Sequence, residues 1–576
     1  MQPTLDLHNW FTTRGQQAAL GNSVQPDIGF APSGQARGMK AYYPTNWKDI
    51  APRFSVAYSP HADDGFLHRL FGSAGKSSLR AGAGIYYDHF GQGIVNSFDK
   101  FGSFSLTSSL QNPANVLTPD TTARFTGLHK LPGLNGAGLG NITYPVQPSN
   151  DPLTTGFAIT YGLDDHIKTP YSEVFDLSFQ REMKGGFTLE ADYIGRFGRH
   201  LLQEIDLAQP LNLVDKKSGM DYYTAATQLS KDVDQGLTDV PAIAYFEDLF
   251  PDAAGLDSYG DGKAGNSATQ NIYNDDWVYS RGNETGALYN LDVFCYPGCG
   301  GKTQRYWPGQ YSSLYAWGSV GSSSYNAAQI TLRHPSSHGL QLDLSYTFSK
   351  AQDMGSDTEL NSTFGGNNYG FLLDAWNPGK NYSISDYNTT NLFSGDWVYR
   401  LPFGRGQHFG SGSNRLVDTV IGGWQWSGLA RMSSGLPFTL YDGNGWATNW
   451  EYESAMVQTG KIDMHKHRDS LGRVQAFAKP SKLLSNLRLP YPGEAGQRNK
   501  FIGDGFFGVD TGFAKAWHLY ESNVLQFGAE IYNVTNSARF DPHSIDGGST
   551  DGSVLGTYSG LLTSNRRMQF SLRYNF

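Results

Sequence analysis

The sequence predicts an all-β protein, an antiparallel transmembrane β-barrel with long extracellular loops. Aromatic residues (14%) and glycines (69) are abundant, while charged residues make up only 17% of the chain, which suits strands joined by many turns. Apolar and polar residues alternate along many short segments, and tight turns alternate with long connections. No apolar run approaches the roughly 20 residues that a membrane helix needs, which excludes a helical membrane protein.

The clearest predicted strand ends the chain. Its apolar and polar side chains fall on opposite faces, because successive residues of a strand point to opposite sides. The apolar row is Met568, Phe570, Leu572, Tyr574 and Phe576, and the polar row is Arg567, Gln569, Ser571, Arg573 and Asn575. This segment resembles the closing strand that outer-membrane barrels present to their assembly machinery. The resemblance implies that Tyr574 and Phe576 form an assembly signal, with outer-membrane lipid and the barrel-assembly machinery as partners.

The same alternation recurs upstream, in segments that can cross a membrane as tilted strands of roughly nine to eleven residues. The predicted strands lie around residues 54–58, 79–87, 175–179, 189–193, 328–332, 342–348, 397–401, 424–431, 507–513, 525–531 and 568–576. They predict a partial barrel of about 11–12 strands.

The connections between these strands indicate how the barrel is oriented. Residues 183–186, 334–339 and 518–523 form tight turns rich in Gly, Ser, Pro or Asn. The long connections are residues 91–169, 203–322, 351–386, 443–504 and 535–565. Short turns on one side and long loops on the other are typical of outer-membrane barrels, so we expect the last strand to end on the periplasmic side.

Charged residues on the polar faces of the strands are expected to line the lumen of the barrel. They are Arg80, Asp176, Asp192, Arg333, Asp343, Asp396, Arg400 and Arg431. Mixed charges are typical of a water-filled or plugged interior. Two interpretations stay open: these groups hold a plug by ion pairs and hydrogen bonds, or they only solvate the lumen.

The long loops contain aromatic residues that are candidates for ligand contact. They are Trp277, Tyr279, Tyr306, Trp307, Tyr311 and Trp317. Such side chains suit peptide or sugar surfaces. Packing of the loops upon themselves is the alternative, and for most of these residues it is the favoured one.

Other motifs give weaker indications. Cys295 and Cys299, the only cysteines, predict either a small loop disulfide or two free thiols. Asp463, His465, His467 and Asp469 alternate along one loop and would project to one side of an extended segment, as zinc or copper ligands could, but a solvated loop is the favoured interpretation. We therefore predict no metal and no cofactor. The sequence contains no supported Ser-His-Asp or Cys-His arrangement, so no enzyme activity is expected, and a net charge of −9 argues against nucleic acid as a partner.

Seven motifs in order along the chain resemble the Oar-like branch of TonB-dependent outer-membrane receptors. They are Ala51-Pro52-Arg53-Phe54 with the strand to Asp88, Tyr193-Ile194-Gly195 before Gly198-Arg199, Tyr325-Asn326-Ala327, Ser345-Tyr346-Thr347-Phe348, Leu401-Pro402-Phe403-Gly404, Gly423-Trp424-Gln425 to Phe438, and Glu530-Ile531-Tyr532-Asn533. The resemblance implies an outer-membrane location and uptake of a bulky ligand driven by the TonB energy-coupling system.

Full members of that branch combine a signal sequence and a plug with a barrel of about 22 strands. Here residues 1–49 suggest a loop with a strand remnant around Leu5 to Trp10, and residues 50–576 suggest the C-terminal portion of the barrel. No signal sequence, plug or energy-coupling box is recognisable, so we expect a fragment of a receptor or transporter. The alternatives are an outer-membrane structural or adhesion protein without transport, and a secreted all-β binding module.

Overall fold

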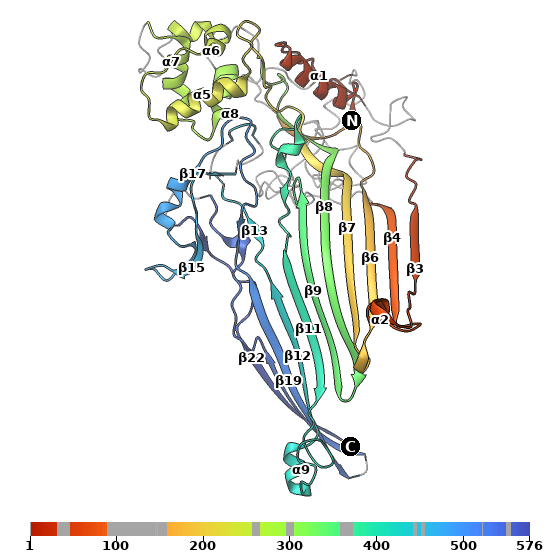
Figure 1. Cartoon of the computed structure of the whole chain (residues 1–576). Coiled ribbons are helices and arrows are strands. Elements are labelled where there is room, and N and C mark those ends of the chain that lie inside the picture. Colours follow the sequence, from red (N-terminus) through yellow and green to blue (C-terminus); the bar gives the residue numbers. More distant parts are fainter. Residues whose placement is uncertain are drawn as a thin grey trace, which may run out of the picture.

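One large antiparallel sheet dominates the computed structural model of the chain (Figure 1). The structure describes residues 2–31, 46–88, 145, 147, 158–255, 265–294, 304–356, 372–441, 446–450, 455–520, 522–548 and 554–576. Eleven strands lie side by side in chain order: β3 (Arg53–Tyr58), β4 (Ser77–Tyr87), β6 (Tyr171–Glu182), β7 (Thr188–Asp206), β8 (Tyr311–Ser337), β9 (Leu340–Asp353), β11 (Asn391–Arg400), β12 (Trp424–Ser433), β19 (Phe506–Tyr520), β20 (Asn523–Tyr532) and β22 (Arg567–Asn575). The predicted all-β fold class is confirmed.

Each of these strands is antiparallel to its neighbours, so the first, third and every second strand after them in this row run in the same direction. β3 and β22 are the two edges of the row and therefore run in the same direction. Among the described strands, neither edge pairs with the other. Two short strands lie off this path: β5 (Ala158–Leu163) pairs in parallel with β8, and β10 (Ser383–Ile384) pairs with β9.

The tight turns lie at one end of the sheet, together with the C-terminus (Figure 1). Gly185 and Gly186 have φ values of 81° and 82°, a backbone conformation that glycine adopts without steric cost. His338 and Gly339 turn the chain between β8 and β9 in the same way, with φ values of 51° and 80°. Two other connections at this end carry the short helices α2 (Gly65–Phe71) and α9 (Arg415–Ile421).

At the opposite end, the connection between β7 and β8 folds into a helical unit rather than an extended loop. It contains α5 (Tyr222–Asp234), α6 (Ala244–Leu249), η4 (Pro251–Gly255), α7 (Ala268–Ile272), η5 (Tyr273–Trp277), α8 (Glu284–Tyr289) and η6 (Asn290–Phe294). In α5, Tyr222, Ala225, Ala226 and Leu229 are buried at helical spacing, and the Asp221 carboxylate accepts the Thr224 N–H at the helix start. The strands also reach further than predicted, to Asp206 and back to Tyr311, because the loop boundaries 203 and 322 fall inside β7 and β8.

The expected strand remnant around Leu5 to Trp10 is wrong. Residues Leu7–Ala19 form helix α1, which the Asp6 carboxylate caps by accepting the Asn9 N–H. Leu7, Trp10, Phe11, Arg14 and Ala18 are buried, a spacing that follows the helical repeat and not the strand repeat.

The connections beside the helical unit form a second cluster with its own core, around Phe438, Phe477 and Phe501. It holds β13 (Pro437–Phe438), β14 (Val457–Gln458), β15 (Met464–Arg468), β16 (Val474–Phe477), η9 (Pro480–Lys482), η10 (Leu484–Asn486), β17 (Leu487–Arg488), β18 (Phe501–Ile502), η11 (Pro542–Ser544) and β21 (Thr557–Tyr558). The remaining short elements are β1 (Gln2–Pro3), β2 (Phe30–Ala31), η3 (Lys184–Gly186) and η8 (Pro378–Asn381).

The predicted loops 443–504 and 535–565 are thus connections with short strands and turns. Most of the predicted loop 91–169, and residues 357–371 of the loop 351–386, lie outside the described residues. Of the helices described, none is long and apolar enough to cross a membrane.

Candidate functional site

The cross-strand register places all eight charged residues predicted for the lumen on one face of the main sheet, which we term the polar face. Residues directly opposite each other on antiparallel strands share a face. Arg333 lies opposite Asp343, and Asp343 lies opposite Asp396. The same register puts the remaining five on this face: Arg80, Asp176, Asp192, Arg400 and Arg431.

Some of these charges are paired across the strands, and others are not. The Arg333 guanidinium lies 3.1 Å from Asp343 Oδ2 through Nε and 3.3 Å from Glu190 Oε2 through Nη1. The guanidinium groups of Arg400 and Arg431 make no hydrogen bond or ion pair with any residue that the structure describes. The polar face therefore keeps cationic groups that are available to a ligand or to another segment of protein.

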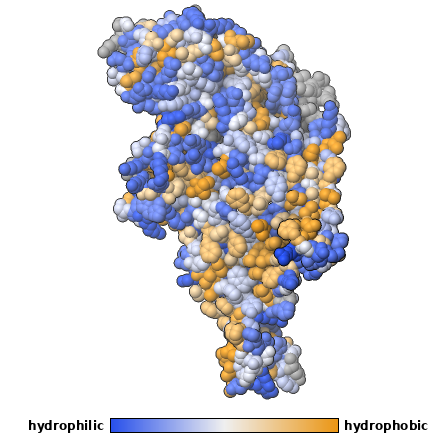
Figure 2. Space-filling view, in the orientation of Figure 1, coloured by the Kyte–Doolittle hydropathy of each residue, from blue (hydrophilic) through white to orange (hydrophobic). Residues whose placement is uncertain are grey.

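The opposite face is apolar along its whole width and is exposed. Phe54 on β3 is 74% exposed, and Phe570, Leu572 and Phe576 at the other edge are 68%, 69% and 92% exposed. Figure 2 shows apolar residues gathered over the strands, whereas hydrophilic residues predominate over the loop layer above them. A continuous exposed apolar surface of this kind suits contact with lipid.

At the end of this row, Tyr574 lies on the edge strand β22, and Phe576 directly follows its last residue. Their rings lie 6.0 Å apart, and the Tyr574 hydroxyl donates to Asn523 Oδ1 at 3.1 Å. Tyr574 lies on the apolar face, because it pairs opposite Leu525 on β20.

Five of the six aromatic residues considered for ligand contact are buried, so they do not present a surface to a ligand. Trp277, Tyr306 and Trp307 belong to the core of the helical unit and are fully buried. Tyr311 and Trp317 are not loop residues: both lie on β8 and are buried there. Only Tyr279, 74% exposed, is positioned to touch a partner.

The four alternating residues of the weak metal candidate do not converge. They belong to strand β15 and its ends, and the register with β16 shifts between Met464 and His467. Such an irregularity breaks the one-sided projection expected of an unbroken strand. The Asp469 carboxylate accepts hydrogen bonds from Arg473, 2.8 Å from Nε, and Asp463 Oδ1 lies 3.2 Å from Lys461 Nζ. Within the described part of the chain, no group of three or more His, Cys, Asp or Glu side chains is placed to hold a metal ion. Cys295 and Cys299 lie outside the described residues.

Sequence reasoning missed a set of buried charged groups beneath the helical unit. Arg14 of α1 is fully buried and donates to the backbone carbonyls of Leu207 (2.5 Å), Gln209 (3.2 Å) and Tyr306 (3.4 Å). It thereby fastens the N-terminal helix to the connection that follows β7 and to the segment before β8. Alternation gave no signal for it, because α1 lies outside the strands.

Glu204 is the second buried group of this kind. It is 1% exposed, and neither of its carboxylate oxygens has a hydrogen-bond partner among the described residues. Residues Thr188 to Gly198 of β7 suffice to cross a membrane, so Glu204 lies beyond the crossing. Burial raises the pKa of Glu204 to about 8, which keeps this carboxyl mostly protonated at neutral pH.

Asp292 in the helical unit is half-buried, and its carboxylate is satisfied. Its carboxylate accepts the backbone N–H groups of Arg305 and Tyr306 at 2.7 and 2.9 Å. Burial raises the pKa of Asp292 to about 6, and these hydrogen bonds oppose the shift. The role of Asp292 is to close the loop before β8.

A family profile described as "Outer membrane beta barrel domain" matches residues 6–569 of the sequence. Among solved structures, the outer-membrane transporter YddB of Escherichia coli is 10% identical with a TM-score of 0.35, over 91% of this chain and 40% of that chain. The pyoverdine receptor FpvA of Pseudomonas aeruginosa is 8% identical with a TM-score of 0.32, over 91% of this chain and 36% of that chain. The ferric enterobactin receptor PfeA of Pseudomonas aeruginosa is 9% identical with a TM-score of 0.31, over 91% and 39%. The chain thus spans less than half the length of each of these proteins. No curated protein matches the sequence significantly.

Proposed function

Since the chain belongs to the outer membrane β-barrel domain family, we propose that it is the C-terminal barrel portion of a TonB-dependent receptor of the Oar-like branch. In this proposal it takes part in uptake or handling of a bulky ligand. The family places the chain in the outer membrane, and a secreted binding module is not favoured. The seven motifs between Ala51 and Asn533 support the Oar-like assignment.

The observation that carries the proposal is the direction of the two edge strands. A membrane does not tolerate open sheet edges, because their backbone N–H and C=O groups have no water to bind. β3 and β22 run in the same direction, so pairing them directly would give a parallel junction. A fully antiparallel barrel therefore requires an odd number of further strands between them. A plugged transporter of about 22 strands would need about eleven more, which is an odd number.

The two faces of the sheet have separate roles in this proposal. The apolar face contacts lipid, and the polar face contacts a plug or a ligand through unpaired groups such as Arg400 and Arg431. The loop layer, with the helical unit and α1, covers the extracellular mouth. Energy for transport comes from the TonB system on the periplasmic side, where the tight turns lie.

Intact-mass measurement of the protein extracted from the outer membrane tests the proposal. We expect a polypeptide heavier than the 63.3 kDa of this sequence. The additional sequence ahead of Arg53 should contain an odd number of strand-forming segments. A mature protein of 63.3 kDa or less, folded and resistant to protease in the membrane, would contradict it.

A second measurement separates a transporter from an adhesion barrel. Photo-crosslinkers placed in the periplasmic turns, for example at Lys184 or His338, are expected to react with the barrel itself and not with TonB. TonB is expected to react only with a crosslinker in a plug. Crosslinking to TonB from the plug-bearing segment of the longer polypeptide is the expected result. Its absence in energised cells would favour a barrel that does not transport.

A further inference from the structure

We propose that a cavity on the polar face, between the upper ends of β12, β19, β20 and β22, is a binding site for an oxyanion, a phosphate or carboxylate group. The cavity has a volume of about 610 Å³, and Arg431 and Arg567 both line it. The proposal rests on the proposed function in one respect, that the polar face lines the interior of a barrel. It adds the chemistry of the group that this interior binds.

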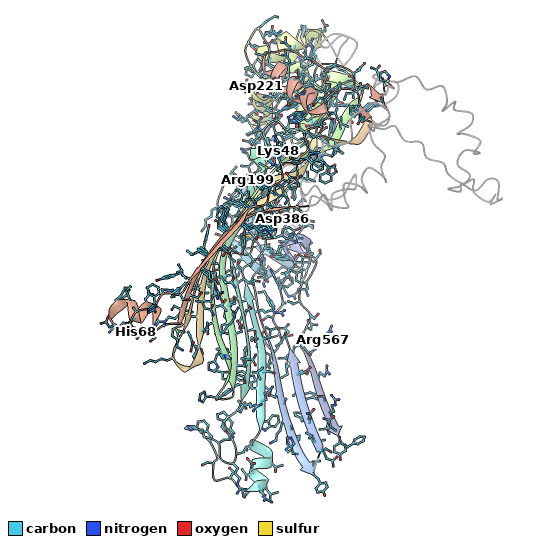
Figure 3. The ribbon with its side chains drawn as sticks, turned by 90° about the vertical axis from the view of Figure 1, so that its right-hand side faces the viewer. Lys48, His68, Arg199, Asp221, Asp386 and Arg567 are labelled. Atoms are coloured by element: carbon cyan, nitrogen blue, oxygen red, sulfur yellow. The ribbon has the colours of Figure 1, made fainter. Side chains whose placement is uncertain are left out.

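The sheet brings the two arginines to one cavity, although 136 positions of sequence separate Arg431 from Arg567. Arg431 lies opposite Gly508 on β19, and Arg567 lies opposite Tyr532 on β20. Strands β19 and β20 lie between β12 and β22, so three strand spacings of about 4.8 Å each separate the strands that carry the two arginines. Figure 3 shows Arg567 at the upper end of its strand, below the loop layer.

Gly508 and Phe506 on β19 both line the cavity. A Cβ atom added to Gly508 would overlap the ring of Phe506, which lies beside it. The glycine therefore makes room for the Phe506 ring, which forms an apolar part of the cavity lining.

The charges in the cavity favour an anion. Neither guanidinium forms a hydrogen bond or an ion pair with the residues that the structure describes, unlike that of Arg333 on the same face. The one carboxylate in the lining, Asp510, is partly compensated, because its Oδ1 accepts the Asn533 N–H at 2.6 Å. Two cations against one compensated anion leave a net positive cavity.

Guanidinium groups match this ligand chemistry. Arginine presents several N–H donors in a planar fork that suits the paired oxygens of carboxylates and phosphates. The oxyanion can belong to a free ligand or to an acidic side chain of a polypeptide segment inside the barrel. Both sources use the same contacts, and the experiment separates them.

The experiment maps arginine reactivity in the protein extracted from the outer membrane in detergent. Phenylglyoxal labels accessible guanidinium groups, and mass spectrometry of the peptides reports each site with and without inorganic phosphate. Arg400 is the matched control, an exposed and unpaired arginine on the same face outside the cavity. We expect phosphate to slow labelling of Arg431 and Arg567 and to leave labelling of Arg400 unchanged.

The other outcomes are equally informative. If Arg431 and Arg567 resist labelling even without phosphate while Arg400 reacts, the cavity is already filled by a polypeptide carboxylate, which supports the site and identifies its source. If all three react at the same rate in both conditions, the site does not exist. This test does not depend on strand number or molecular mass, so its failure is distinguishable from failure of the proposed function.

Titration with phosphate gives the quantitative test on variants. We expect R431Q and R567Q each to weaken phosphate binding about tenfold, equivalent to about 1.4 kcal/mol. R400Q should bind as the unmodified protein does. Equal weakening in R400Q would reveal only general attraction by net charge and would overturn the proposal.

Discussion

The indole ring of Trp397 on β11 lies over the backbone of Gly428 on β12, directly opposite it in the register, and fills the space that a side chain there would occupy. Trp397 also packs against Trp426, with ring centroids 5.1 Å apart. The glycine thus allows two large rings to lie side by side on the apolar face. This arrangement makes a direct prediction about stability.

Gly428→Ala should destabilise the barrel by about 1–3 kcal/mol, the usual cost of adding a group to a filled space. The new methyl group would overlap the Trp397 ring, which is held in place by Trp426. The urea midpoint of unfolding in detergent measures the effect. Gly412→Ala is the control, because nothing lies within 4 Å of a Cβ atom at that position. Equal midpoints for the two variants would show that Trp397 moves freely.

Arg14→Met should release helix α1 from the loop layer. The substitution removes the Arg14 donor from the carbonyl groups of Leu207 and Gln209, at about 1–3 kcal/mol for each buried unsatisfied group, whereas the Tyr306 carbonyl keeps the Leu211 N–H at 3.1 Å. Limited proteolysis should then cut within residues Leu7–Ala19. Gln16→Met, on the exposed side of the same helix, should stay resistant. Cleavage at equal rates in both variants would argue against this anchoring role.

The raised pKa of Glu204 predicts a specific dependence of the free energy of unfolding on pH. Its folded-state pKa of about 8 lies above the ordinary value of 4.5, so the folded protein binds the proton more tightly than the unfolded chain does. The contribution of Glu204 to the free energy of unfolding is therefore fully present below pH 4.5, is lost as the pH rises from 4.5 to 8, and is absent above that range. Each unit of pKa difference corresponds to about 1.4 kcal/mol.

Glu204→Gln should remove this component and flatten the profile between pH 5 and pH 9. Thermal unfolding at several pH values measures it, with Glu182→Gln as a control because Glu182 is exposed and paired with Lys76. A Glu204→Gln profile that falls as steeply as that of the unmodified protein would rule out Glu204 as the source.

Phe576→Ala should reduce the amount of assembled protein in the outer membrane severalfold, if the terminal apolar row is the signal that the assembly machinery binds. Phe576 is 92% exposed, so the substitution removes little packing from the folded sheet. Quantitative blotting of membrane fractions measures assembly. Asn575→Ala, on the polar face of the same strand, should assemble normally.

Much of the sheet is predictable because each strand carries its own signal. In β9 and β22 the alternation alone separates the two faces, and the register places Arg333, Asp343 and Asp396 on one face. The tight turns are predictable for a similar reason, since Gly185 and Gly339 mark them locally.

The loop layer and the cavity are much less predictable. The sequence does not distinguish an aromatic residue that faces a ligand from one that is buried in a core. Trp277 is buried in the core of the helical unit. Helix α1 is short and is stabilised by contacts with distant segments rather than by its own sequence. That Arg431 and Arg567 line one cavity depends on the register of four strands, which no local sequence pattern shows.

The most direct test of the account examines the two faces of β22 in the membrane. Nitroxide labels are placed one at a time at positions 568 to 573, in a background where Cys295 and Cys299 are replaced by serine. Collision rates with oxygen, which dissolves in lipid, and with a water-soluble nickel chelate then report the surroundings of each label. If β22 crosses the membrane, labels at positions 568, 570 and 572 should collide mainly with oxygen. Labels at positions 569, 571 and 573 should collide mainly with the chelate, in strict alternation. Equal exposure of both sets to the chelate would contradict a membrane-embedded barrel strand.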